Sequence, residues 1–384
     1  MPGLDELAGL VEKIAPETLE LRRLLHRHPE PAHREHQTTD LIRRFVESHG
    51  LQFTGREPKT GGWVDVGNAA LVGFRADIDA LPIEEPAGNS PRSETEGWMH
   101  ACGHDAHAAI AAGVAVILSR LDNHPGIRII FQPAEEVFPG GAVDLVDEGA
   151  ADGLTALLAF HVDPSLRVGR LGARVGPITA GADALTISIH GPGGHTSRPH
   201  KTVDLITAAA RVAAELPGAI RSSIDARSAI VTAFGSIHGG DAANVIPTEV
   251  ILKGTVRTLD PGLWDVLPSL VDKTLGSILA VTGAGYTLEY RQGIAPVVND
   301  GTVVERATTA IRQEMGGETI VDTEPSMGGE DFSTYLTVTR GALLRLGAAS
   351  GGGDLHSASF SFNESALPFA IHAGVLALLG LSRS

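Results

Sequence analysis

AALVGFRADIDALP, residues 69–82, is the stretch that decides the fold. Its short apolar run ends in charged residues, the pattern of a buried strand that delivers polar groups at its carboxyl end. A helical stretch, 106–121, follows, and then two further buried strands at 127–136 and 154–164. Alternating strands and helices predict an α/β fold: a mostly parallel sheet flanked by helices, with its chemistry at the carboxyl edge of the sheet.

A different pattern begins after Gly181. We expect strands and helices in the order β-α-β-β-α-β at 183–191, 201–216, 228–240, 248–260, 261–283 and 286–293. This is the order of a ferredoxin-like split unit, which is a candidate inserted domain. The first pattern then returns at 303–316, 341–349 and 367–381, and a helical region at 5–48 precedes the first strand. The predicted domains are therefore a discontinuous one, 1–180 and 293–384, and an inserted α+β domain, 181–292.

The composition limits the classes of function and partner. The chain has 384 residues, more than one hydrophobic core usually organises, and its formal net charge of −16 would repel nucleic acid. No apolar run reaches the roughly 20 residues of a membrane span, and no secretory signal is visible. The single cysteine excludes an intramolecular disulfide and fits a reducing compartment. We expect a soluble, cytoplasmic protein with neither a nucleic-acid nor a membrane partner.

Candidate metal ligands occupy the predicted strand ends and loops: Cys102 and His104, Glu135 and Glu136, His161, and His356. Thiolate, imidazole and carboxylate together suit a borderline-soft divalent ion such as zinc, whereas magnesium and calcium prefer oxygen alone. Any one of the 16 histidines is more often an ordinary core or surface residue, so the joint occurrence carries the argument. Cys-Gly-His is too tight for half of a structural zinc site, which favours a catalytic one.

The adjacent glutamates can divide two tasks. Neighbouring side chains at a strand end point in different directions, so one carboxylate can reach a metal ion while the other takes a proton from a water molecule. The residues alone do not decide which of Glu135 and Glu136 has which task. Without the other ligands, a solvated acidic pair in a loop would be the ordinary interpretation.

The chain resembles hippurate hydrolases and indole-acetyl-amino-acid hydrolases, an N-acyl-amino-acid amidohydrolase branch of the aminoacylase and carboxypeptidase G metallopeptidase family. The resemblance runs from about Arg22 to Ala366 and rests on ordered motifs: RADIDALP (75–82), HACGHDAHAA (100–109), QPAEE (132–136), HVDP (161–164), GGHTSRPH (193–200), NVIP (244–247), PSMGGEDFS (325–333) and LHSASFSFNE (355–364). It implies a zinc-exopeptidase-like catalytic domain with two divalent metal ions. The inserted domain would be a lid and the interface of a homodimer.

The resemblance also assigns roles at the metals. Cys102 would bridge both ions, His104 and His161 would complete one site, and Glu136 and His356 the other. Glu135 would be the general base. Zinc is the first expectation for both ions, and manganese, cobalt and nickel are the alternatives that the resemblance allows.

From the lid, the resemblance brings three residues to the substrate. His195 would stabilise the substrate oxyanion as a catalytic residue, while Asn244 and Arg257 would bind substrate. Arg is the natural bidentate partner of an amino-acid carboxylate. As ordinary interpretations, His195 is a loop side chain, Asn244 a turn residue and Arg257 a strand residue in a surface ion pair.

One departure from the wider family concerns Arg75. Carboxypeptidase G-like members have a metal-binding His two residues before an Asp, and this chain has Arg75 there, two residues before Asp77. A guanidinium cannot bind a cation, so Asp77 loses its task of orienting that imidazole. Asp77 is expected either to support the metal ligands from behind or to serve only the fold.

The predicted activity is hydrolysis of the amide bond of an N-acyl amino acid, such as an N-acetyl or N-benzoyl conjugate, by a metal-activated water. One alternative is a dipeptidase or carboxypeptidase on small peptides, which shares the chemistry and differs in the pocket. Another is a non-catalytic metal- or ligand-binding relative, which would be expected to lack a ligand or the base. A dinucleotide-binding enzyme is excluded because no G-x-G-x-x-G follows the first strand.

Overall fold

The computed structural model describes residues 4–121 and 126–382, in two compact units. The first unit is Met1–Gly176, Val298–Glu324 and Asp331–Ser384, and the second is Pro177–Val297 and Pro325–Glu330. The predicted inserted domain, 181–292, lies within the second unit, and the prediction does not include the segment 325–330. Each unit has a hydrophobic core of its own.

The first unit is built on a sheet whose strands are β1 (Phe53–Gly55), β2 (Gly62–Val66), β3 (Ala70–Asp77), β4 (Gly126–Gln132), β5 (Ala156–Asp163), β6 (Leu171–Ala173), β15 (Ile320–Asp322) and β16 (Gly341–Gly347). Their order is β1-β2-β4-β3-β5-β16-β6-β15. The central strands β4, β3, β5 and β16 are parallel to one another, whereas β1, β2 and β6 add antiparallel pairs. The central strands are nearly continuous apolar runs, as strands buried on both faces must be.

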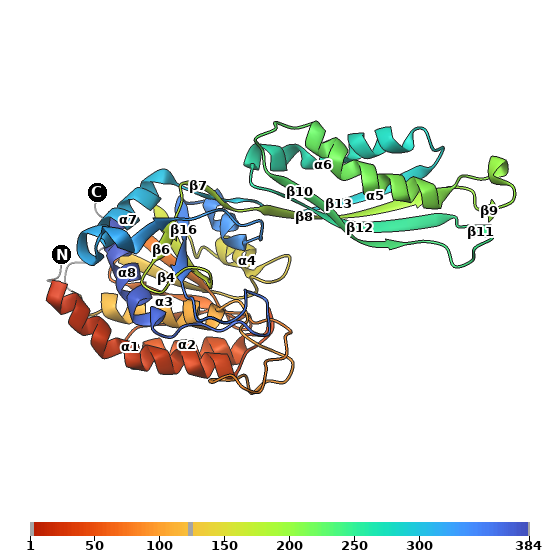
Figure 1. Ribbon diagram of the computed structural model, residues 1–384. Coiled ribbons are helices and arrows are strands. Elements are labelled where there is room, and N and C mark those ends of the chain that lie inside the picture. Colours follow the sequence, from red (N-terminus) through yellow and green to blue (C-terminus); the bar gives the residue numbers. More distant parts are fainter. Residues whose placement is uncertain (1–3, 122–125, 383–384) are drawn as a thin grey trace. The chain divides into compact units, whose positions relative to one another are not determined.

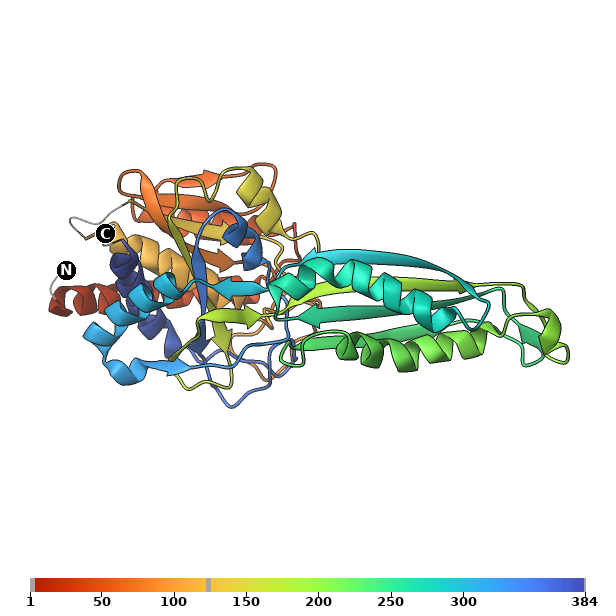
Figure 2. The same cartoon turned by 90° about the horizontal axis from the view of Figure 1, so that it is seen from above.

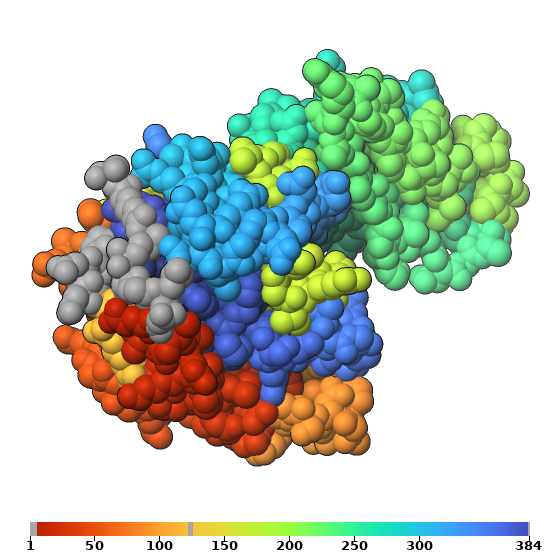
Figure 3. Space-filling view, turned by 60° about the vertical axis from the view of Figure 1, so that its left-hand side comes forward, coloured from red at the N-terminus to blue at the C-terminus, as the bar shows by residue number. Residues whose placement is uncertain are grey.

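Helices flank this sheet (Figure 1), which confirms the predicted α/β architecture. They are α1 (Leu4–Arg27), α2 (His36–Ser48), α3 (His104–Leu118), α4 (Gly141–Asp147), α7 (Gly301–Met315) and α8 (Ala366–Leu381), with short 3-10 turns η2 (Gly317–Thr319) and η3 (Asp331–Thr337). α3 and α8 pack against β3, and α1 packs on both helices, so α1 and α8 lie on the same side of the sheet. Figure 3 shows the red segment of α1 and the blue C-terminal segments on one face of this unit. Every residue of α3 is buried, and after its polar first turn, which holds His104, Asp105 and His107, its sequence is apolar throughout.

The N-terminal helical region is interrupted, which the sequence prediction of 5–48 did not include. α1 ends at Arg27 and α2 begins at His36. Pro29 and Pro31 lie between them, and proline removes a backbone donor and disfavours a helical residue before it. In the two units as described, no helix combines the length and the apolar character that crossing a membrane requires.

The second unit has an antiparallel sheet of β8 (Gly181–His190), β10 (Ile230–His238), β12 (Glu249–Thr258) and β13 (Gly285–Ile294), in the order β10-β12-β8-β13. With α5 (Leu205–Ser222) and α6 (Pro261–Leu279), this is the order expected of the split β-α-β-β-α-β unit. Both helices cover the same side of this sheet (Figure 2). Buried Leu185 and Ile187 face them, and Thr186 and Ser188 alternate onto the other side.

The remaining elements are short. They are β7 (Gly176–Thr179), β9 (Gly194–His195), η1 (Pro199–Lys201), β11 (Val245–Ile246) and β14 (Val297–Asn299). β9 and β11 pair with each other and extend one end of the second unit's sheet, because the ladder passes from His190↔Glu249 to Gly194↔Ile246.

Candidate metal centre

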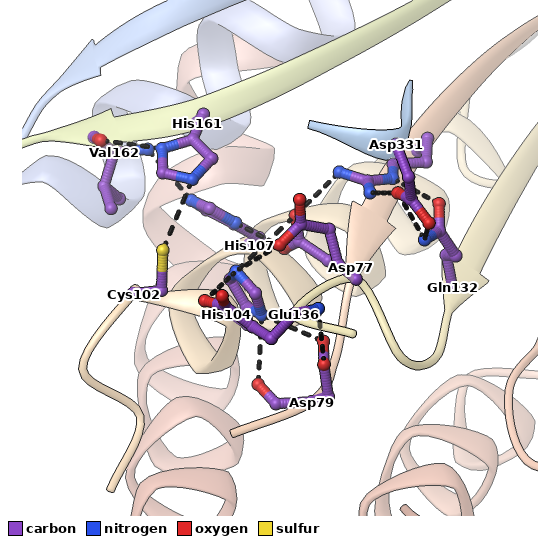
Figure 4. A network of polar contacts seen from close by, with 12 residues as sticks. Asp77, Asp79, Cys102, His104, His107, Gln132, Glu136, His161, Val162 and Asp331 are labelled. Carbon is purple, nitrogen blue, oxygen red and sulfur yellow. Dashed lines mark hydrogen bonds and ion pairs between the residues drawn. The ribbon is translucent and has the colours of Figure 1, made fainter. Parts of the chain in front are cut away.

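The first unit brings all the predicted metal ligands and the predicted base together. Potential ligand atoms lie within 4.8 Å of one another in three overlapping sets: Cys102, His104 and His161; Cys102, Glu136 and His356; and His104, Glu135 and Glu136. Figure 4 shows Cys102, His104, Glu136 and His161 pointing toward one another. The predicted ligands lie in the turn before α3 and at its first residue, near the end of β5, in the loop after β4 and, for His356, in the loop before α8. The carboxyl ends of parallel strands meet at one edge, which explains the convergence.

The backbone of Gly103 accounts for the Cys-Gly-His spacing. Gly103 has φ of +80°, and a Cβ added there would lie 2.6 Å from Cγ2 of Val162. Both facts exclude a larger residue. The left-handed turn at Gly103 starts α3, whose first residue is His104, so Cys102 and His104 approach the same point from either side of the turn.

Two imidazoles have their protons fixed by backbone carbonyls. Nδ1 of His104 lies 3.0 Å from the carbonyl oxygen of Asp79, and Nδ1 of His161 lies 2.9 Å from the carbonyl oxygen of Val162. A carbonyl can only accept, so each Nδ1 carries the proton and each Nε2 is left to bind a cation. Nε2 of His161 lies 3.5 Å from Sγ of Cys102, and the buried Nε2 of His104 has no hydrogen-bond partner among the described residues.

The second set of ligands depends on two strained residues. Nε2 of His356 lies 3.1 Å from Oε1 of Glu136. His356 has φ of +59°, and Ala134, just before the glutamate pair, has φ of +55°. Left-handed backbone at residues other than glycine is costly and concentrates at functional sites. The predicted strand 127–136 also ends earlier, at Gln132, so the glutamates lie on a turn after the strand rather than on it.

The charges of the site suit a bound cation. Burial lowers the pKa of His104, but Asp77 and Cys102 outweigh burial and leave this pKa well above its ordinary value. Hydrogen bonds to Cys102 and Glu136 raise the pKa of His356 to about 10. Burial raises the pKa of the Cys102 thiol. Without a cation these groups hold protons, and metal binding would release those protons. Sulfur, nitrogen and oxygen donors in overlapping sets therefore fit divalent transition-metal ions.

Asp79 was missed by the sequence interpretation, although it lies inside the RADIDALP motif. Its buried side chain accepts a hydrogen bond from the backbone N–H of Glu136 at 3.0 Å and lies 3.2 Å from Nδ1 of His104. Asp79 therefore fixes one ligand side chain and the backbone of another. No spacing rule would have identified it, because its contacts depend on how β3 and β4 end side by side.

Arg75 and Asp77 belong to a buried polar network. Figure 4 labels Asp77, Gln132 and Asp331 of this network. Nη1 of Arg75 donates to Asp77 at 2.6 Å, and Nη2 donates to Asp331 at 2.9 Å. Asp77 orients His107 rather than a residue at position 75, because its Oδ1 lies 2.6 Å from Nδ1 of His107. Burial would raise the pKa of Asp77, but His104, His107 and Arg75 hold it well below its ordinary value. Asp77 thus supports both histidines on the first turn of α3.

His107 lies close to the ligands but is not suited to bind a metal. It groups with Asp77 and His104 within 4.8 Å. However, the backbone N–H of Val162 donates to Nε2 of His107 at 2.9 Å, so the ring proton lies on Nδ1 and is donated to Asp77. Neither nitrogen is left for a cation. The sequence signal for His107 was its position three residues after His104, on the same face of the helix.

The three predicted substrate residues of the second unit are not all together. His195 and the chain next to Asn244 share the β9–β11 ladder, where Val245 pairs with His195. Arg257 lies near the opposite end of β12, where its Nη1 donates to the carbonyl oxygen of Met327 at 2.9 Å. At about 3.3 Å per residue, the path along β12 from Glu249 to Arg257 is roughly 26 Å. One small substrate cannot contact both ends of this strand.

Two overlapping sets of S, N and O ligands at the edge of a parallel sheet, with a further carboxylate beside them, define a hydrolase-like metal centre. The chain belongs to peptidase family M20/M25/M40, whose model matches residues 73–379. A solved Bacillus subtilis structure described as a dinuclear metal binding peptidase from the M20 family has a TM-score of 0.83 and 31% identity. The match covers 97% of this chain and 99% of that one.

Two curated relatives extend the comparison. N-acetyl-L-cysteine deacetylase of Bacillus subtilis (strain 168) is 34% identical over 356 residues, which is 90% of this chain and 84% of the relative. A longer Rhodococcus jostii (strain RHA1) protein, named "Putative glutamate--cysteine ligase 2-3", is 40% identical over 370 residues. The match covers 95% of this chain but only 46% of that protein, so this chain spans less than half of its length.

We predict that metal removal makes Cys102 more reactive. A coordinating thiol is covered and deprotonated by the metal, and Cys102 is the only cysteine, so one thiol per chain reports on the centre. Chelator-stripped protein should react with a thiol reagent faster than metal-loaded protein. A Cys102→Ser variant gives the background, and denatured protein gives the full count. Equal rates with and without metal would show that Cys102 is not a ligand.

Proposed function

We propose that this chain is a two-metal amidohydrolase that cleaves the amide bond of N-acyl amino acids. The observation that carries the proposal is the sharing of Cys102 between two complete ligand triplets, while Glu135 is needed by neither. A spare carboxylate beside two cation sites is what metal-assisted amide hydrolysis requires. The B. subtilis deacetylase supports the N-acyl substrate class, and the dinuclear B. subtilis structure supports two ions.

Cys102 would bridge the ions, with His104 and His161 completing one site and Glu136 and His356 the other. Two divalent ions held there would lower the pKa of a water molecule toward ~7 and polarise the scissile carbonyl. Glu135 would accept the proton of that water and pass it to the leaving amine. Zinc is the metal that we propose first, because a thiolate is shared, with manganese, cobalt and nickel as the alternatives.

We also propose that the second unit is a lid and the contact surface of a homodimer. His195 would stabilise the oxyanion, and Asn244 and Arg257 would bind substrate. Arg257 and His195 lie far apart along β12, which supports an arrangement in which one subunit contributes residues to both active sites of the dimer. Arg257 would then serve one active site, and His195 and Asn244 the other site of the same dimer. The cytoplasmic location and the lack of nucleic-acid and membrane partners stay predictions.

The second candidate is a dipeptidase or carboxypeptidase. The description of the B. subtilis structure as a peptidase favours it, and the chemistry at the metals would be the same. Purified protein, analysed for metal, should be tested on N-acetyl, N-benzoyl and indole-acetyl amino acids and on dipeptides. Preference for the N-benzoyl or indole-acetyl substrates would place it in the hippurate hydrolase branch. Preference for dipeptides would replace the proposal with the peptidase, and no hydrolysis by metal-loaded protein would leave a non-catalytic relative.

Glutamine variants of the glutamate pair should differ in metal content more than in rate. Glutamine keeps the shape of glutamate but cannot accept a proton at neutral pH, so Glu135→Gln should keep its metal and lose about 10²–10⁴-fold in kcat. Glu136→Gln should lose metal, because a neutral amide is a poorer ligand, and should recover part of its rate with excess metal. If Glu135→Gln is the metal-depleted variant and Glu136→Gln stays loaded and inactive, the two roles are reversed.

Mixing two inactive variants should restore activity if His195 acts across the dimer. In a heterodimer of Glu135→Gln and His195→Ala chains, one of the two sites has an intact Glu135 and receives an intact His195 from the partner. Random exchange should therefore restore about a quarter of the wild-type rate. The matched control mixes Glu135→Gln with Glu136→Gln, whose defects lie in the same unit of each chain. No restoration in the first mixture, under conditions where subunits exchange, would assign His195 to its own subunit.

A further inference from the structure

Three residues other than glycine have left-handed backbone in the part of the chain that the structure describes: His33, Ala134 and His356, with φ of +63°, +55° and +59°. This conformation brings Cβ close to the following carbonyl oxygen, so a non-glycine residue adopts it only where other contacts hold it there. His356 belongs to the proposed ligand set. Ala134 directly precedes Glu135 and Glu136, and His33 lies far from them in sequence.

One buried carboxylate holds two of these three residues. Oε1 of Glu35 accepts a hydrogen bond from the backbone N–H of Ala134 at 2.8 Å and from that of His33 at 2.9 Å. Its Oε2 accepts from Oγ1 of Thr60 at 2.6 Å. Glu35 is 0% exposed. A fully buried carboxylate is costly unless it is well hydrogen-bonded, and here one of its two oxygens accepts from both strained N–H groups.

The position of the Glu35 side chain is not explained by capping of its own helix, α2. Glu35 is the N-cap residue of α2, yet its side chain makes no capping hydrogen bond. Glu30 performs that task instead, since its carboxylate accepts from the backbone N–H groups of Gln37 at 3.1 Å and Thr38 at 2.8 Å. The carboxylates of Glu30 and Glu35 therefore have separate functions. Only the Glu35 carboxylate contacts the turn that precedes Glu135 and Glu136.

The turn is also fixed on its other side. The carbonyl oxygen of Ala134 accepts from the N–H of Gly141 at 3.0 Å, and the N–H of Glu136 donates to Oδ2 of Asp79 at 3.0 Å. Glu35 is the group that holds the N–H of Ala134. If that contact is lost, the backbone at Ala134 can relax toward an unstrained conformation, and the two glutamates change direction with it.

We propose that Glu35 is a positioning residue for the glutamate pair: its buried carboxylate holds Ala134 in the left-handed conformation that directs Glu135 and Glu136 toward the metal centre. The catalytic consequence rests on the proposed function, because it requires Glu135 to act on a water molecule. The conformational consequence does not, since it concerns only the backbone of residues 134–136. Glu35 itself touches neither substrate nor metal in this role.

The first test compares Glu35→Ala with Glu30→Ala at saturating metal. Both variants remove the acceptor oxygens of one carboxylate near the start of α2, but only Glu35 contacts Ala134. Misplacing a reacting group by about 1 Å can cost 10²-fold, so Glu35→Ala should lower kcat by roughly 10- to 100-fold with little change in KM. Glu30→Ala should keep the wild-type kcat, even if both variants melt at lower temperature.

The second test is a rescue by glycine. Glycine adopts positive φ without the penalty that alanine has, so Ala134→Gly should favour the turn without help from Glu35. The double variant Glu35→Ala/Ala134→Gly should recover roughly tenfold in kcat over Glu35→Ala alone, the size of the left-handed penalty. If Glu35 contributed only to the overall stability of the protein, a change at Ala134 would not restore kcat.

The third measurement does not depend on activity. Amide hydrogen exchange of a peptide covering residues 133–137 should be faster in Glu35→Ala than in wild type and Glu30→Ala. If wild type hydrolyses no substrate, the proposed function fails and this measurement still decides the role of Glu35. Unchanged exchange, equal kcat in Glu35→Ala and Glu30→Ala, or a double variant no faster than Glu35→Ala would each overturn the proposal.

Discussion

The metal centre depends on two hydrogen bonds from imidazole to backbone. Nδ1 of His104 donates to the carbonyl of Asp79, and Nδ1 of His161 donates to the carbonyl of Val162. Each bond selects the tautomer that leaves Nε2 facing Cys102 or the glutamates, and each fixes the plane of the ring. Since both carbonyls belong to segments at the carboxyl edge of the sheet, the parallel strand order is what makes the ligand geometry available. The proposed lid, base and substrate contacts would be useful only once these rings are fixed.

Next to the candidate ligands, the buried positive charge of Arg75 is paired with the buried carboxylates of Asp77 and Asp331. Arg75 lies between Asp77 and Asp331, and all three side chains are almost fully buried. An unpaired charge in this position would be strongly destabilising, whereas a hydrogen-bonded network is tolerated. The guanidinium gives Asp77 a permanent cationic partner at the place where the wider family has a metal-binding histidine. Asp77 is then available to hold His107. The other ring nitrogen of His107 accepts a hydrogen bond from the backbone N–H of Val162, the residue after His161.

Much of this could be predicted from the sequence, because apolar runs that end in polar residues indicate parallel strands and ligands. That reasoning led to β3, β4, β5 and β16 and to the six residues around Cys102. It gave no role to His107, because the contacts of that ring depend on Asp77 and on a backbone N–H of a distant strand. Nor did it foresee the turn at Ala134, since alanine has no preference for left-handed backbone and the conformation is imposed by Glu35. The distance between His195 and Arg257 likewise requires the register of β12, which spacing alone does not give.

Sharing one sulfur between two ligand sets has a consequence for oxidative chemistry. In a centre with separate ligands, damage to one residue would leave the other site intact. Here Cys102 belongs to both triplets, and the chain has no second cysteine that could form a disulfide with its sulfenic acid within the same molecule. Burial of Cys102 and, in the proposed enzyme, its coordination would therefore serve a protective purpose as well as a structural one. Further oxidation to the sulfinic acid is irreversible in most proteins, and it would disable both proposed sites in a single chemical event.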